Sequence, residues 1–541
     1  MVDWVGHRAH RHSVMREQGQ WVGILDRNWE PVLTIEDWES ATWGAVFGDT
    51  GSMEMQLLGH LADGSRNPAV EALLMADLKE LDNPASMEQL FHSGIHIAVE
   101  RPGLARRVYK VTSLTPEGGV DYPTRLTVAG ADMVEHLKHL PLWADPSNRS
   151  KIVQLQFADI QQGSVEDVSR KLIGRNLIGY QQPSLLSSMF SWTDNYSNPS
   201  TWRGFNPQLH NLICSPIKSG LPSEWCIIDA RWDNAWDLIS ASWQAAGVLP
   251  IVDLWLPGDT QPFPEHATLS QPTGVISFSP RSTVSGAAGL LSQGWSQLQR
   301  VISMEDKFTS VVGMGDSVPS ADGRDPWVVF EVDEAPPMTI TKSSDSRFLV
   351  GSQSPKGLND VIEVGIKTVV AAIVAGIPGI GPIAAEIIKG GGELLSKMAA
   401  DKFLVLNEFT DQARKQYHGR SGYISVAKPG AGNSIETLQK AWQAKTETAG
   451  GLSVPFEVAD PYPYLPGRDF DLGDTVGIRA WGAIWAAYVS ELPWTSTSAN
   501  PVGWQLSIGN LTELKNMDEL LARNAESVRN VIGRLSTFVG S

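Results

Sequence analysis

The chain has 541 residues, too many for a single hydrophobic core, so about three or four domains are expected. Its hydrophobic content of 42% and charged content of 19% are those of a globular protein and exclude a disordered chain. The net charge of −17 argues against a general nucleic-acid-binding protein, because phosphate contacts need a basic surface.

Tryptophan is unusually frequent, with 20 Trp against 9 Tyr. Because these residues are spread along the whole chain, we expect them to pack in cores and interfaces. A carbohydrate-binding surface would use the same residue, and this alternative stays open. The spacing of Cys214 and Cys226 fits no usual zinc site, so two reduced structural thiols are predicted. The N-terminus lacks the apolar segment of a secretory signal, so we expect synthesis in the cytoplasm without a signal peptide.

Residues 20–130 are predicted to form β-structure. Met53, Met55 and Leu57 alternate with polar residues after a Gly-Asp-Thr-Gly turn, which is typical of a strand with one buried face. Short strands separated by turns indicate a small barrel or sandwich. The other predicted strands of this region lie at residues 95–100, 107–114 and 125–129.

Residues 150–300 are predicted to mix helices and strands. Ser164 is the predicted N-cap of a helix over 165–172, and Gly247 is the predicted C-cap of a helix over 234–246. The remaining predictions are a helix over 131–140 ended by Pro141, a loop region over 180–222, and strands over 251–256 and 327–332.

Residues 358–445 are predicted to be an apolar helical insertion. Residues 368–385 carry no charge, which approaches the length of a membrane span, but prolines and glycines interrupt them. We therefore expect a helical hairpin buried against other subunits. The alternative is a segment that becomes exposed and enters a membrane. The candidate hairpin residues are Val369, Val370, Ile373, Val374, Ile377, Pro378, Ile380, Pro382 and Ile383.

Strands are predicted again over residues 452–510, and a heptad repeat follows them. Apolar residues at alternating spacings of three and four fill the a and d positions of an oligomerising helix. The alternative is one amphipathic helix packed on its own domain. The candidate oligomerisation residues are Leu514, Met517, Leu521, Asn524, Val528, Val531, Leu535 and Phe538.

Catalytic motifs of the common nucleotide-binding, zinc-protease and serine-hydrolase types are absent from the sequence. The pairs His136 with His139 and His92 with His96 have metal-like spacing but no third ligand, so surface or packing roles are expected. No catalytic, cofactor-binding or metal-binding residue is assigned, and no enzyme is expected. Nothing marks an acid–base pair in the acidic set of Asp229, Asp233 and Asp237.

The N-terminal segment carries a basic cluster and is predicted to be a solvated tail, with contact to an acidic partner as the alternative. The cluster consists of His7, Arg8, His10, Arg11, His12 and Arg16.

Five segments together resemble a known family. They are DRNWEPVLTIEDWESATWGAVFGDTGSMEMQLLGH, LTVAGADMVEHLKHLPLWADP, NAWDLISASWQAAGVLPIVD, SVVGMGD and DFDLGDTVGI. Their order resembles that of the baseplate hub proteins of long-tailed phages, especially the minor tail proteins of siphophages that infect actinobacteria. Each segment is short, but together they extend over nearly the whole chain.

The resemblance implies a β-rich, multidomain α+β fold with two hub-type β-barrels and α/β additions. The helical hairpin insertion and the C-terminal heptad helix are departures of this chain from the plain hub. The predicted domains are a first barrel at 1–145, a mixed α/β domain at 146–300, a second barrel at 301–357 and 446–512, the insertion at 358–445 and the helix at 513–541.

The function implied by the resemblance is that of a structural subunit of the tail tip in the virion. Such a hub closes or extends the tail tube, connects the distal tail ring to tip proteins and takes part in DNA delivery. The implied partners are two further copies in a homotrimer, the distal tail protein, the tape measure protein and other tail-tip or fibre proteins. The apolar segment adds, as the alternative to burial, contact with a host membrane through residues 358–400, and the net charge predicts no sequence-specific nucleic acid. The alternative function is a carbohydrate- or receptor-binding tail protein that contacts the host cell wall. A wall-degrading enzyme is a third class, against which the missing motifs argue.

Overall fold

The computed structural model describes the residues on which every structural statement below rests. They are residues 2–74, 83–102, 104–146, 158–181, 196–202, 205–221, 223–281, 328–331, 337, 339–352, 405–430, 444, 448, 451–453, 456–458, 461–462, 464–467, 470–481, 483–498 and 503–509. The predicted hairpin at 369–383 and the predicted heptad helix at 514–538 lie outside the described residues. The described part has a mixed, strand-rich α+β fold.

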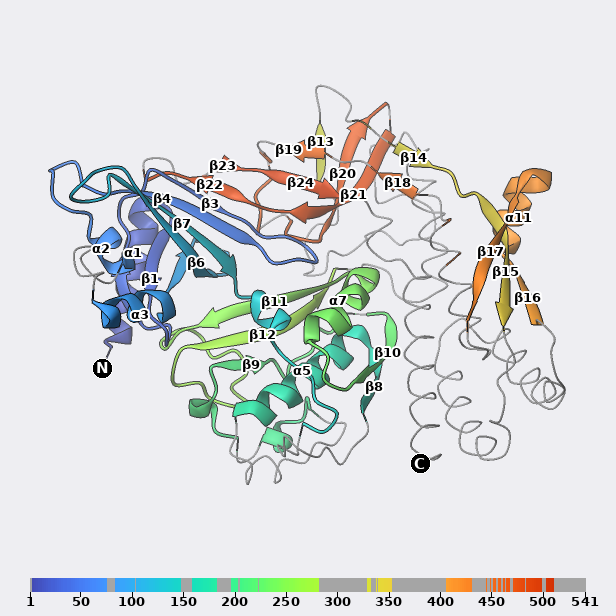
Figure 1. Ribbon diagram of the computed structural model, residues 1–541, viewed down its shortest axis with the longest axis horizontal. Coiled ribbons are helices and arrows are strands. Elements are labelled where there is room, and N and C mark those ends of the chain that lie inside the picture. Colours follow the sequence, from blue (N-terminus) through green and yellow to red (C-terminus); the bar gives the residue numbers. More distant parts are fainter. Residues whose placement is uncertain are drawn as a thin grey trace.

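One sheet of nine strands forms the N-terminal part, in the order β2-β1-β5-β6-β7-β4-β3-β22-β23. Its side-chain pattern confirms the predicted alternation, because Met53, Met55 and Leu57 are buried while their neighbours point outward. The last two strands come from the far end of the chain (Figure 1). The bounds are β1 Trp21–Leu25, β2 Pro31–Thr34, β3 Ser40–Trp43, β4 Ser52–Leu58, β5 His96–Glu100, β6 Arg107–Glu117, β7 Arg125–Asp132, β22 Trp494–Ser496 and β23 Gly503–Trp504.

Helix α1 (Trp4–Gln18) occupies the segment that the sequence analysis expected to be a solvated tail, so that prediction is wrong. The Asp3 carboxylate accepts a hydrogen bond from the Gly6 backbone N–H and caps the helix at its start. Gly19 adopts a φ of 77° at its end, a left-handed conformation that glycine takes without a steric penalty. Two shorter helices, α2 (Pro68–Leu74) and α3 (Pro84–His92), also belong to this part.

The central unit combines helices with short sheets below the N-terminal sheet (Figure 1). The two predicted caps are confirmed: the Ser164 hydroxyl accepts from the Asp167 N–H, and Gly247 ends its helix with a φ of 64°. The bounds are α4 Glu135–Lys138, β8 Asp159–Ser164, α5 Val165–Gln181, η2 Pro199–Trp202, η3 Pro207–Leu209, β9 Leu212–Cys214, β10 Trp225–Ala230, α7 Ala235–Ala246, β11 Val248–Trp255 and β12 Thr273–Pro280.

The helix predicted over 131–140 is mostly wrong. Ala131 and Asp132 extend β7, because Ala131 pairs with Ser52 of β4 and Asp132 pairs with Tyr109 of β6. Only the four residues of α4 are helical. Pairing with two neighbouring strands therefore outweighs the local helical preference.

A five-stranded sheet in the order β13-β20-β21-β24-β19 forms the C-terminal part. Its members agree with the strands predicted over 327–332 and 452–510. The predicted second barrel would have kept all the strands of 446–512 together, whereas β22 and β23 join the N-terminal sheet instead. The bounds are β13 Val329–Glu331, β19 Phe456–Val458, β20 Thr475–Ala480, β21 Ala483–Glu491 and β24 Leu506–Gly509.

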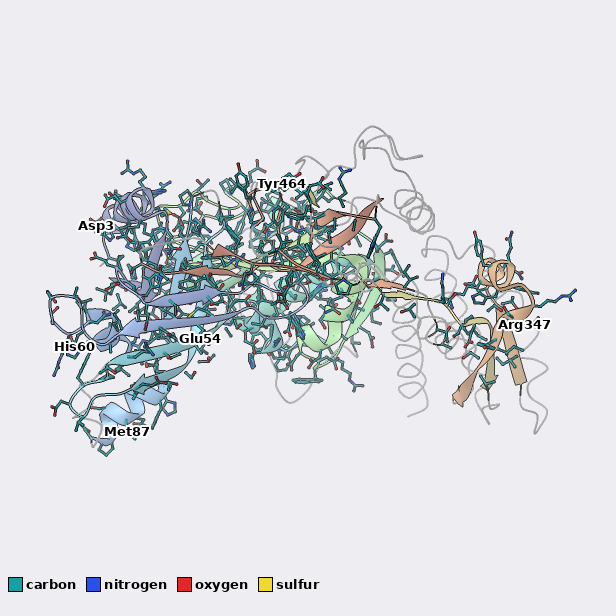
Figure 2. The ribbon with its side chains drawn as sticks, turned by 90° about the horizontal axis from the view of Figure 1, so that it is seen from above. Asp3, Glu54, His60, Met87, Arg347 and Tyr464 are labelled. Atoms are coloured by element: carbon teal, nitrogen blue, oxygen red, sulfur yellow. The ribbon has the colours of Figure 1, made fainter. Side chains whose placement is uncertain are left out.

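A separate three-stranded sheet, in the order β16-β15-β17, carries α11 on one side. It lies at one end of the longest axis, where Arg347 is labelled in Figure 2. Residues 405–430 belong to the stretch that was predicted as helical, and they contain two strands as well as a helix. The bounds are β14 Thr339–Thr341, β15 Asp345–Ser352, β16 Val405–Thr410, α11 Gln412–His418, η5 Gly419–Ser421, β17 Tyr423–Gly430 and β18 Gly451–Ser453.

One hydrophobic core joins the N-terminal and C-terminal sheets, with Trp43 and Met55 from the first sheet and Ile478 and Val489 from the second. A second core belongs to the central unit and includes Met15 of α1. The prediction that tryptophans serve packing is confirmed for nine buried ones: Trp21, Trp29, Trp38, Trp43, Trp202, Trp243, Trp255, Trp494 and Trp504. None of the described helices has both the length and the apolar character needed to cross a membrane.

Candidate functional site

The four histidines that were weighed as metal ligands lie in packing or surface positions. His96 is buried on β5 with its ring 5.9 Å from that of Trp29, and burial lowers its pKa to about 4. His136 packs 6.3 Å from the same indole, while His139 pairs with Glu135 at 3.3 Å. His92 is exposed at the end of α3, so it does not share a face with His96.

The remaining polar candidates do not gather into a reactive site. Asp229 is buried in β10, whereas Asp233 and Asp237 are exposed. Cys214 and Cys226 are free and buried, as predicted, and burial raises the pKa of the Cys214 thiol to about 12. Within the described ranges, no group of three or more His, Cys, Asp or Glu side chains could hold a metal ion.

A charged site lies where α1, the N-terminal sheet and the central unit meet. We call it the junction network, and it consists of Arg11, Glu100, Arg106 and Asp259. Arg11 pairs with the Glu100 carboxylate and lies 2.8 Å from Asp259 Oδ1. Arg106 lies 3.0 Å from Glu100 Oε2 and 2.9 Å from Asp259 Oδ2. Each arginine therefore bridges the same two carboxylates.

Electrostatics favours the ionised form of Asp259 in the junction network. Burial favours the neutral form of Asp259, but Arg106 and Arg11 outweigh it and lower the pKa of that carboxyl. Arg106 also donates a hydrogen bond to the Leu254 carbonyl, which fixes the guanidinium against β11. The neighbouring His7 has its pKa lowered to about 4 by burial and by Arg11, so it stays neutral near pH 7. The network thus joins three parts of the chain by paired, hydrogen-bonded charges.

A second contact joins the two ends of the chain through aromatic residues. Trp43 of β3 pairs in register with Trp494 of β22, and their ring centroids are 6.3 Å apart. The indole N–H of Trp43 donates to Ser496 Oγ at 3.0 Å. The Arg107 guanidinium lies 4.3 Å from the centroid of a Trp494 ring, within the range of a cation–π interaction.

A third contact joins the central unit to the C-terminal sheet. Arg281, which follows β12, lies 3.4 Å from Asp474 and 3.7 Å from Asp471. Asp253 of β11 lies close to the same acidic turn. Burial raises the pKa of Asp253 to about 6, with Arg106 lowering it and Asp471 raising it further. These charges connect the central unit to the C-terminal sheet.

Sequence reasoning missed the junction network, because Arg11 was assigned to a tail. Asp3 and Gly19 were the available signals, since a capping aspartate and a terminal glycine enclose a helix-length segment. The predicted hairpin residues at 369–383 and the heptad positions at 514–538 lie outside the described residues, so their predicted roles stay predictions.

Residues 21–510 match the family described as Siphovirus ReqiPepy6 Gp37-like protein. None of the curated proteins matches the chain. Among solved structures, the tail protein from Neisseria meningitidis MC58 is similar with 9% identity and a TM-score of 0.37, covering 94% of this chain and 99% of that one.

Two further solved structures are similar at the same level. The 43 kDa tail protein of prophage MuSo2 from Shewanella oneidensis has 9% identity and a TM-score of 0.36, covering 91% of this chain and 98% of that one. Prophage tail protein gp18 from Listeria monocytogenes EGD-e has 10% identity and a TM-score of 0.35, covering 94% of this chain and 99% of that one. The assignment rests on the family match: because it extends over residues 21–510, the chain belongs to the siphovirus ReqiPepy6 Gp37-like family of tail proteins.

Proposed function

We propose that this protein is a baseplate-hub subunit that closes or extends the tail tube at the tail tip. The observation that carries the proposal is the nine-stranded sheet, which unites strands from both ends of the chain. Its edge strands, β2 and β23, have backbone groups without a further strand among the described residues. Such edges can pair with a neighbouring subunit, which is a direct way to continue a β-walled ring.

The hub would connect the distal tail ring to tip proteins and contact the tape measure protein. The net charge of −17 supports a role in DNA delivery without DNA binding, because an acidic wall repels the phosphate backbone. The function is structural and requires no catalytic residue. Zymography with host cell walls tests this point, and a clearing zone produced by the purified chain would contradict it.

Electron microscopy of the purified protein and of the parent virion tests the hub assignment. The expected result is a ring with threefold symmetry and a central channel, located at the tail tip by a label on the chain. A chain found only on peripheral fibres, or one that forms no ring in the virion, would overturn the proposal.

The heptad helix would hold three copies together. Charged residues in an a/d seam abolish its apolar packing, so Leu521→Asp combined with Val528→Asp should convert a trimer into monomers in light-scattering chromatography. Glu526→Gln, at an outer heptad position, is the matched control and should remain trimeric. A full chain that stays monomeric at micromolar concentration would exclude this role of residues 514–538.

The apolar hairpin would be buried against another tail protein and plug or extend the tip. Its alternative role is to enter the host membrane after infection begins. A peptide of residues 358–400 separates the two, because a membrane-active segment releases dye from liposomes. Absence of leakage at every pH would exclude the membrane role.

A further inference from the structure

Three aromatic side chains from separate elements meet on the surface of the central unit. They are Trp143 after α4, Tyr180 in the last turn of α5 and Trp232 after β10, and we call them the aromatic cluster. The ring centroids of Trp143 and Trp232 are 4.2 Å apart, and those of Trp143 and Tyr180 are 5.9 Å apart. Trp232 is 51% exposed and Tyr180 is 41% exposed. The cluster therefore presents ring surface to solvent.

Hydrogen bonds fix the backbone that carries the aromatic cluster. The Trp232 N–H donates to the Leu142 carbonyl at 2.7 Å, and the Leu142 N–H donates to the Asp233 carbonyl at 2.8 Å. Leu142 is fully buried, and the next residue, Trp143, donates its N–H to Asn176 Oδ1 at 2.8 Å. The Trp143 indole N–H also donates to the Tyr180 hydroxyl. Both indoles thus stand on backbone that the core holds in place.

Trp232 is held in a strained conformation, with a φ of 118°. Bulky L-residues rarely adopt this region, which glycine adopts freely. The residue is also exposed, so the indole gains little burial in return for the strain. Backbone strain together with an exposed large aromatic ring is typical of a binding position rather than of a packing position.

We propose that the aromatic cluster binds a saccharide ring of the host cell surface. The C–H-rich face of a pyranose or furanose is apolar and slightly positive, and it stacks on the negative face of an indole. The exposed Asp233 carboxylate, adjacent to Trp232 in the chain, offers acceptor oxygens for sugar hydroxyls. This inference does not depend on the hub role, since it concerns a surface of the isolated chain.

The size of the aromatic cluster favours a saccharide over a protein partner. Three partly exposed rings offer roughly 200–300 Å² of apolar surface. A stable protein interface needs about 800 Å² from each partner. One or two sugar rings match the smaller area, and polar hydroxyls around their edge tolerate solvent.

Calorimetric titration of the full chain with a panel of tetrasaccharides of N-acetylglucosamine, glucose, galactose and arabinofuranose tests the proposal. At least one probe should bind with a micromolar to millimolar Kd. Trp232→Gly, which removes the ring and suits the positive φ, should weaken that Kd at least tenfold without lowering the thermal midpoint. Trp232→Tyr should retain part of the affinity.

Trp481→Ala is the matched control, since Trp481 is also exposed, at 61%, but lies on the turn between β20 and β21. Its Kd should equal that of the unaltered chain. The proposal is overturned if no tetrasaccharide binds, or if Trp232→Gly binds the tetrasaccharide as well as the unaltered chain does. It is also overturned if Trp232→Gly changes the association state and leaves saccharide binding intact, which would identify a protein contact. The ring expected in electron microscopy does not depend on any of these results.

Discussion

Arg11 shows how a single residue can hold a junction between units. Its side chain is 1% exposed, and both of its carboxylate partners lie outside its own helix. A buried arginine is costly to desolvate, and that cost is offset here by two carboxylates and their hydrogen bonds. Met15 of α1 packs in the core of the central unit, so the charge pairing and the apolar packing fix the same helix.

Replacing Arg11 by Met should lower the free energy of unfolding by about 2–3 kcal/mol, because the two carboxylates Glu100 and Asp259 then share Arg106 alone and half of their paired charge is lost. Arg125→Met is the control, since the Arg125–Glu39 pair is exposed and should contribute less than about 1 kcal/mol. Urea unfolding at pH 7 measures both. Equal losses in the two variants would show that the junction network adds no special stability.

The pH dependence of this effect has a definite sign. The pKa of Asp259 is lowered in the folded chain, so its pairing stabilises the fold above about pH 4, the value of a free carboxyl. That contribution is lost as the pH falls through the lowered pKa. The difference between Arg11→Met and the unaltered chain should therefore narrow below about pH 4.

Asp253 should show the opposite dependence. Its folded pKa of about 6 lies above the ordinary value of 3.8, so the protonated form is the one that the fold favours. The free energy of unfolding should fall by roughly 1–2 kcal/mol as the pH rises from about 4 to about 6, and then level off. Asp253→Asn should remove this slope. Identical pH profiles for the two chains, or a carboxyl NMR titration midpoint near 4, would contradict the assignment.

At the scale of elements, the pairing of β3 with β22 joins residues that lie more than four hundred positions apart. Trp43 is opposite Trp494, and the Trp43 indole is hydrogen-bonded to the 3% exposed Ser496. The indoles of Trp43 and Trp494 are buried in the core that the two parts of the chain share. The hydrogen bond is therefore shielded from water.

Ser496→Ala should lower the free energy of unfolding by about 1–2 kcal/mol, because it leaves the buried Trp43 N–H without an acceptor. Thr495→Ala is the matched control in the same strand: Thr495 is exposed, and its loss should cost less than about 0.5 kcal/mol. Thermal or urea unfolding measures the difference. A Ser496→Ala variant as stable as the control would mean that the indole finds another partner.

At the scale of the whole molecule, the N-terminal and C-terminal sheets form one cooperative body, because they bury one continuous core. A smaller core around Phe263 and Trp202 lies apart from it in the central unit. Cooperative units follow contiguous cores rather than contiguous sequence. The interlocked ends of the chain are therefore expected to open together.

Trp494→Ala should reduce the amide exchange protection of β3 and of β20 and β21 alike. The free energy of opening of the shared unit should fall by about 3–5 kcal/mol. Phe263→Ala is the control, and its loss of protection should concentrate around residues 263–275. Hydrogen exchange followed by mass spectrometry resolves both patterns. Protection lost in β3 alone would show that the two sheets unfold independently.

The sequence by itself determined those features that depend on neighbouring residues. The alternation around Met55, the caps Ser164 and Gly247, and the buried free thiols follow from periodicity, backbone geometry and composition. The succession of short strands and the five family-like segments also sufficed to predict the siphophage tail family, which the family match confirms. These are local signals, or sums of local signals along the chain.

Only the tertiary structure decided how distant segments combine. The entry of β22 and β23 into the N-terminal sheet, and the pairing of β15 with β16 and β17, depend on contacts between residues far apart in sequence. The burial of Arg11 depends on carboxylates that lie 89 and 248 positions away. A strand carries the same local pattern whichever sheet it joins, so its partner is selected by the total core that the folded chain can bury.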